Sequence, residues 1–167
     1  INLSTTTVLR AIVYSPTAGI LPSFTETNTY FFGNDNHTIP VVSISGTTLD
    51  GGWNGNELTN LEFFQNGTFV VESHGDSNEH GNDSNAYGQR GFDYITRDAL
   101  GYDNKLEHPM LHTSDRQSYQ RLIFKAAAND NYPFSNGGAH IRDAYVCELS
   151  RLGNLQDRKS TRLNFSH

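Results

Sequence analysis

The stretch that most constrains the fold of this chain is a β-hairpin signature near its middle. In "LEFFQNGTFVVES", Leu61 to Ser73, two runs of alternating apolar residues flank the dipeptide Asn66-Gly67. Asn and Gly tolerate positive φ, which a two-residue type I′ turn requires at both of its central positions. The alternation is expected to bury one face of each strand and to solvate the other. An antiparallel sheet built around this hairpin is therefore expected.

The opening third of the chain predicts two further strands. The segments "TTVLRAIVYS" and "ETNTYFF" are rich in β-branched and aromatic residues, and the Pro and Gly signals of "SPTAGILPS" separate them. After them, "GNDNHT", Gly33 to Thr38, favours turns, and Pro40 prevents a helix from running through. We therefore expect a domain boundary here, with one unit over residues 1–33 and a second from Ile39, which opens with the strand "IPVVSIS".

The second half of the chain predicts more strands and then a helix. "RGFDYITRD", Arg90 to Asp98, is typical of a strand, and "RLIFKAAA", Arg121 to Ala128, of a strand or a buried segment. After Gly138, apolar residues follow the helical period at Ile141, Ala144, Tyr145, Leu149 and Leu152. Strands followed by a helix packed on them indicate an α+β fold.

Composition excludes several classes of protein and partner. A net charge of −6 argues against a duplex nucleic-acid partner, which would require a basic face. No apolar run is long enough to span a membrane, and no signal peptide opens the segment. The lone Cys147 excludes an internal disulfide framework and a multi-cysteine zinc site, and its apolar surroundings in "AYVCEL" predict a packed thiol.

The final stretch, "DRKSTRLNFSH" from Asp157 to His167, is unlike the rest of the chain. Its polarity rises where the helical pattern stops. Reverse translation of the stretch is compatible with a common sequencing-library adapter that carries one changed base, at Phe165. We therefore expect residues 157–167 to be a non-native tail without packed structure, and the native segment to end near Gln156.

Five motifs in register indicate a family. The motifs "PVVSISG", "LEFFQNG", "HGNDSNAYGQRGFDYITRD", "YQRLIFKAAANDNYP" and "GGAHIRDAYVCELSR" occur in this order between Ile39 and Arg151. Together they resemble the amino-terminal half of the spore-coat CotH kinase family. The strands of residues 1–32 resemble the last strands of the β-sandwich modules of chitobiase-type enzymes, whose other strands are expected before Ile1. The resemblance implies the amino-terminal lobe of an atypical protein-kinase-like α+β fold over residues 39–156, preceded by an incomplete β-sandwich.

The resemblance also implies an activity. Members of this family transfer the γ-phosphoryl group of ATP, with Mg²⁺, to Ser or Thr side chains of secreted or coat proteins, outside the cell or at its surface. The carboxylates that orient the acceptor and hold magnesium belong to the carboxyl-terminal half, so the catalytic residues are expected beyond the end of this chain and the segment alone is expected to be inactive. The alternative is a catalytically dead surface or coat interaction module that keeps the fold.

Three residues are candidates for the nucleotide site that the resemblance implies. Gln89-Arg90 stands where many family members have a pair of lysines, and the Arg90 guanidinium can contact two phosphate oxygens at once. Asp130, in "KAAANDN", and Arg142, on the expected helix, are expected to converge with Arg90. The alternative is structural, because Asp130 suits a turn, Arg142 a helix end, and Arg90 an exposed ion pair.

Histidines and acids also raise the possibility of a metal site. The candidate ligands are His74, Asp76, His80 and Asp83, and separately His108 and His112 with their i, i+4 spacing. Neither group forms a recognisable complete ligand set, so no metal site is predicted from them. The motif GxSxG of a serine hydrolase is absent, and Ser43 and Ser45 are expected to be ordinary strand residues.

Overall fold

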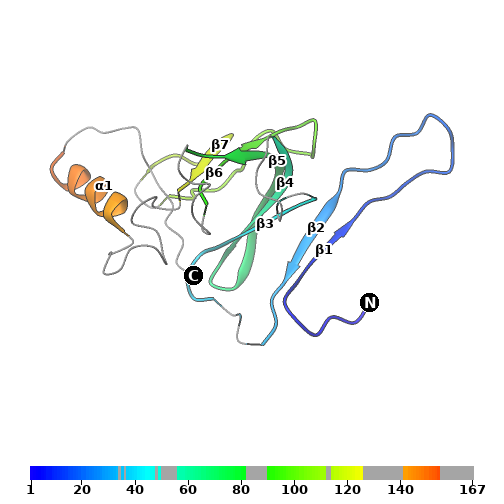
Figure 1. The fold of residues 1–167 in the computed structure, drawn as a ribbon, viewed down its shortest axis with the longest axis horizontal. Coiled ribbons are helices and arrows are strands. Elements are labelled where there is room, and N and C mark those ends of the chain that lie inside the picture. Colours follow the sequence, from blue (N-terminus) through cyan, green and yellow to red (C-terminus); the bar gives the residue numbers. More distant parts are fainter. Residues whose placement is uncertain are drawn as a thin grey trace.

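The computed structural model describes residues 1–33, 35, 37–47, 49, 56–81, 90–111, 114–125 and 141–154. Its elements are β1 (Thr7–Ala11), β2 (Glu26–Tyr30), β3 (Val41–Gly46), β4 (Glu57–Gln65), β5 (Thr68–Glu79), β6 (Phe92–Thr96), β7 (Arg121–Phe124) and α1 (Arg142–Leu152). The strands form two antiparallel sheets, the pair β1-β2 and a five-stranded sheet in the order β3-β4-β5-β6-β7 (Figure 1). Each strand of the larger sheet therefore pairs with its neighbour in sequence.

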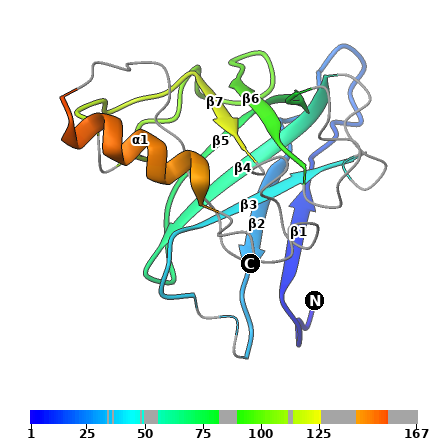
Figure 2. The ribbon, with the colours of Figure 1, turned by 60° about the vertical axis from the view of Figure 1, so that its left-hand side comes forward.

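The expectation of a kinase-like α+β lobe is wrong, because the described fold is almost entirely β. Helix α1 forms where the 3.6-residue period predicts it, yet it does not cover the sheet. Its large apolar side chains stay exposed, Tyr145 at 60% and Leu152 at 67%. In Figures 1 and 2, α1 lies on the opposite side of the five-stranded sheet from the β1–β2 hairpin. The helical period thus predicted the helix, while the sequence carried no information about what its apolar side contacts.

The predicted hairpin is confirmed as β4 and β5. Asn66 has a φ of 53° and Gly67 a φ of 73°, the left-handed values of a type I′ turn, and Gln65 pairs with Thr68 across it. Strands β1 and β2 also pair antiparallel, with Val8 opposite Thr29. The predicted strands near Val41, Phe92 and Arg121 form as well, so the strands were readable from the sequence.

The hydrophobic core lies on one face of the five-stranded sheet. Leu61 of β4 and Tyr94 of β6 are 0% and 1% exposed. The connection between β6 and β7 covers this face with Leu106 and Tyr119, which form an isolated bridge with each other. The Tyr94 hydroxyl lies 2.8 Å from the hydroxyl of Ser73 and donates to the Ser73 carbonyl at 2.8 Å, so the buried phenol is satisfied.

The opposite face of the sheet is polar and carries the β1–β2 hairpin. The Thr29 backbone N–H donates to the Glu62 carboxylate at 3.0 Å, and the Thr29 hydroxyl lies 2.7 Å from the hydroxyl of Ser43. Nε2 of His74 lies 2.7 Å from the carbonyl oxygen of Thr25. Glu62 is 3% exposed, so the hairpin supplies the hydrogen bonds that a buried carboxylate requires. The proposed division into units at residue 33 stays a prediction.

Carboxylates on this polar face make stability depend on pH. Burial raises the pKa of the Glu72 carboxyl, His74 lowers it, and Glu26, Glu62 and Asp103 raise it further. A carboxyl whose pKa is higher in the folded than in the unfolded chain binds its proton more tightly when folded. Its contribution to stability is therefore full below the unfolded value and is lost as the pH rises through the folded value.

Glu72→Gln is expected to flatten the dependence of stability on pH between mild acid and neutrality. At neutral pH the variant should be more stable by about 0.5 kcal/mol, a small gain because Glu72 is only half-buried and solvent screens its neighbours. Urea denaturation of both proteins across this pH range measures the difference. If the free energy of unfolding changes equally with pH in the two proteins, the charge on Glu72 does not destabilise the folded chain.

Candidate functional site

Three neighbouring strands reach the same end of the five-stranded sheet. Glu79, the last residue of β5, pairs with Phe92, the first residue of β6, and Phe92 pairs with Phe124, the last residue of β7. Residues just outside these strands therefore lie at one end of the sheet. We call this region the β5–β7 end and define it by His80, Arg90, Asp93 and Lys125, together with the guanidinium of Arg121, which reaches Asp93 from the start of β7.

A buried carboxylate is the fixed point of the β5–β7 end. Asp93 of β6 accepts a hydrogen bond from Nη2 of Arg121 at 2.6 Å, and Nδ1 of His80 lies 2.9 Å from its other oxygen. The His80 backbone N–H donates to the carbonyl of Gly91 at 3.0 Å, which holds the chain beyond β5 against the start of β6. The Asp93 side chain is only 12% exposed, so its two partners restrict its position.

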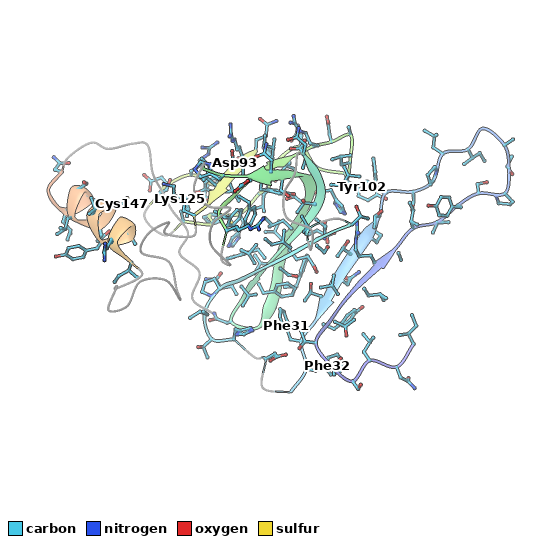
Figure 3. The ribbon with its side chains drawn as sticks, viewed as in Figure 1. Phe31, Phe32, Asp93, Tyr102, Lys125 and Cys147 are labelled. Atoms are coloured by element: carbon cyan, nitrogen blue, oxygen red, sulfur yellow. The ribbon has the colours of Figure 1, made fainter. Side chains whose placement is uncertain are left out.

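Cations outnumber carboxylates around this point. Arg90 stands two residues before β6, is half-buried, and has no ion-pair partner within the described residues. Lys125 follows β7 directly and is also half-buried. Figure 3 labels Asp93 and Lys125 in this part of the molecule. Among the described residues, the three cations Arg90, Lys125 and Arg121 stand with the two carboxylates Asp93 and Glu79, a balance that suits an anionic ligand.

The structure describes two of the three candidate residues for the nucleotide site. Arg90 stands two residues before β6, at the β5–β7 end. Arg142 is the first residue of α1 and is exposed. Asp130 lies outside the described residues, although its segment begins directly after Lys125. The convergence of Arg90 with Asp130 and Arg142 stays a prediction.

Sequence reasoning missed Lys125, Arg121 and the His80–Asp93 contact. Arg121, Ile123 and Lys125 alternate along β7 and its extension, and this period-two spacing places the two cations on one face. Asp93 lies on the same face of the sheet, because it pairs with Ile123. This can be known only from the register of β6 with β7. The pairing register is a tertiary property that neither strand reveals alone.

The residues considered as metal ligands have other partners where the structure describes them. His74 contacts the Thr25 carbonyl, Nε of Arg97 donates to Asp76 at 2.9 Å, and His80 contacts Asp93. Within the described ranges, no group of three or more His, Cys, Asp or Glu side chains is arranged to hold a metal ion. Asp83 and His112 lie outside these ranges.

Comparison with known proteins gives no relative for this chain. No protein-family model, curated protein or solved structure matches it. In the part of the chain that the structure describes, no helix has both the length and the apolar character that crossing a membrane requires. The function must therefore be argued from the residues themselves.

Proposed function

We propose that this chain binds the phosphates of ATP as part of a CotH-like protein kinase, which transfers the γ-phosphoryl group to Ser or Thr of secreted or coat proteins. We propose only the activity of that family, because the expected kinase-like α+β lobe is not the fold of this chain. The observation that carries it is that Arg90 and Lys125 adjoin the same end of three adjacent strands, where the Arg121 guanidinium also binds Asp93. Phosphoryl transfer depends mainly on positioning and charge neutralisation, for which cations fixed on strands are suited.

The residues at this end fit a triphosphate. The guanidinium of Arg90 can donate to two phosphate oxygens, while the Lys125 ammonium offers a compact charge on the neighbouring strand. Arg121 already donates to Asp93, so it would act by its charge and by holding that carboxylate. ATP supplies the phosphoryl group when bound, and the chain's own part is to bind and orient its phosphates. Asp93 has Arg121 and His80 as partners, so we do not assign it to Mg²⁺.

Arg90→Ala is expected to weaken the binding of ATP·Mg²⁺ by about 1–3 kcal/mol, the scale of a charge-assisted hydrogen bond to phosphate. The melting temperature should change little, because Arg90 has no ion-pair partner to lose within the described residues. Calorimetric titration of the purified chain with ATP·Mg²⁺ measures the affinity, and circular dichroism confirms the fold.

Arg97→Ala is the matched control. Arg97 follows the other end of β6, and its Nε pairs with Asp76 at 2.9 Å, so the variant removes the same charge far from the β5–β7 end. The control should bind ATP as the parent chain does. Equal affinities of the Arg90→Ala variant and the parent, or equal losses in both variants, would remove Arg90 from the site.

A second candidate function is an interaction module without catalysis, and one observation favours it. Helix α1 exposes Tyr145 at 60%, Val146 at 59% and Leu149 at 48%, more apolar surface than a short solvated helix requires. A surface or coat protein that assembles with others would use such side chains. Absence of ATP binding by the folded parent chain would favour this candidate over the kinase.

A further inference from the structure

Four polar side chains between the β1–β2 hairpin and the five-stranded sheet bury atoms that have no hydrogen-bond partner. Within the described residues these atoms are Nε of Arg10, Oγ1 of Thr27, Oγ of Ser45, and both Oδ1 and Nδ2 of Asn60. Thr27 is 1% exposed and Asn60 is 3% exposed. A buried polar group without a partner costs about 1–3 kcal/mol, so four of them in one protein require an explanation.

Strand pairing places the four side chains in two adjacent pairs, one on the hairpin and one on the sheet. Ser45 lies directly opposite Asn60, and Arg10 lies directly opposite Thr27. Thr29, two residues along β2 from Thr27, contacts Glu62, which stands two residues along β4 from Asn60. Each step of two residues covers about 7 Å along a strand.

The other end of the hairpin contact fixes the direction. Thr25 contacts His74 through its carbonyl oxygen, and His74 lies directly opposite Asn60. Thr27 stands between Thr25 and Thr29, so it must lie over the sheet between His74 and Glu62. Asn60 borders this area, because it lies opposite His74 and two residues from Glu62, and Ser45 is its neighbour on β3.

We infer that this seam, formed by Arg10, Thr27, Ser45 and Asn60, is a binding site for ordered internal water. Two hydroxyls, one amide and one guanidinium N–H offer both donors and acceptors, and a buried water molecule typically makes about three hydrogen bonds to such groups. An anion is disfavoured by the buried Glu62 nearby, and a metal cation by the guanidinium. Water satisfies both kinds of atom without adding charge.

The seam adds polar contacts to the aromatic ones that hold the hairpin on the sheet, such as the edge-to-face pair of Phe31 with Phe64. The opposite face of the sheet carries the apolar core around Leu61 and Tyr94, whereas β2 contacts its face through Thr25 and Thr29 with Thr27 between them. Water that bridges Thr27 to Asn60 would join these two direct contacts into one continuous hydrogen-bonded interface.

A crystal structure of the full chain that shows ordered water is the direct test. We expect density for water within hydrogen-bond distance of the Asn60 amide and of at least one of the other three groups. Direct hydrogen bonds between Asn60 and the hydroxyls of Thr27 or Ser45, or a closed site without water, would overturn the inference.

A double-mutant cycle tests the same site in solution. If water bridges Thr27 and Asn60, Thr27→Val already disrupts its hydrogen bonds, so adding Asn60→Leu should lower the melting temperature by less than it does in the parent chain. The combination of Thr27→Val with Ser77→Ala is the control, because Ser77 lies on β5 opposite Tyr94, away from the hairpin. Its two shifts should add. Additive shifts in both pairs would contradict a shared bridge, and Ser45→Ala can replace Asn60→Leu if that variant does not fold.

Discussion

Leu61→Ala is expected to lower the free energy of unfolding by about 2–5 kcal/mol. Leu61 is fully buried, at the centre of the core that Phe63, Tyr94 and Leu106 share with it. Removing its terminal carbons loses their transfer free energy and leaves a cavity. The sheet holds the neighbouring side chains in place on adjacent strands, so they can close that cavity only in part. Chemical denaturation monitored by tyrosine fluorescence and by circular dichroism measures the loss.

Leu58→Ala on the same strand is the control for this prediction. Leu58 is 53% exposed, so its truncation removes the same atoms from a site that is already solvated. We expect a change within about 0.5 kcal/mol. A comparable loss in the two variants would show that the core does not lie on the Leu61 face of β4.

The strands of this protein were largely predictable because their signals are local. Asn66-Gly67 requires positive φ at two successive residues, and both residues adopt it. Alternation also predicted that Leu61 and Phe63 lie in the core, whereas the expectation that the other face of β4 is solvated is wrong, because Asn60 and Glu62 are each 3% exposed. Such signals involve only a few neighbouring residues, so they can be recognised in a single sequence.

The fold class was predicted wrongly because it depends on distant contacts. The apolar residues of α1 follow the helical period, which is a local pattern that predicts a helix. The expectation that they pack on the sheet was a statement about tertiary contacts, which this pattern does not determine. Tyr145 and Leu149 are instead exposed. An apolar stripe indicates that one side of a helix is apolar, but it does not identify the residues that cover this side.

The candidate site was only partly predictable for a similar reason. Arg90 was selected because Gln89-Arg90 stands where many members of the resembled family have a pair of lysines. Lys125 reaches the same end only through the pairing of β6 with β7, and Arg121 joins it only through its side-chain contact with Asp93, which His80 also contacts. A cluster assembled from three strands is visible once the register is known.

Gly75→Ala is expected to destabilise the chain by about 3 kcal/mol, the upper part of the range for overpacking. A methyl group at Gly75 would lie 2.1 Å from the carbonyl oxygen of Ile95 and 2.8 Å from its carbonyl carbon. Both atoms belong to the backbone of β6, so no side-chain rotation can relieve the contact. Strands β5 and β6 would have to move apart at the pair that Gly75 forms with Thr96.

Gly19→Ala separates this steric effect from the conformational cost of replacing a glycine. Gly19 has a φ of 85° and open space around it, so alanine there meets strain of about 1–2 kcal/mol but no clash. A loss of stability in Gly75→Ala no larger than in Gly19→Ala would mean that the strands are not in close contact at this point.

The pairing of β5 with β6 also sets the register that brings His80 and Arg90 to the same end of the sheet. Gly75→Ala should therefore weaken ATP·Mg²⁺ binding in the fraction that remains folded, although residue 75 lies within the strands and away from the β5–β7 end.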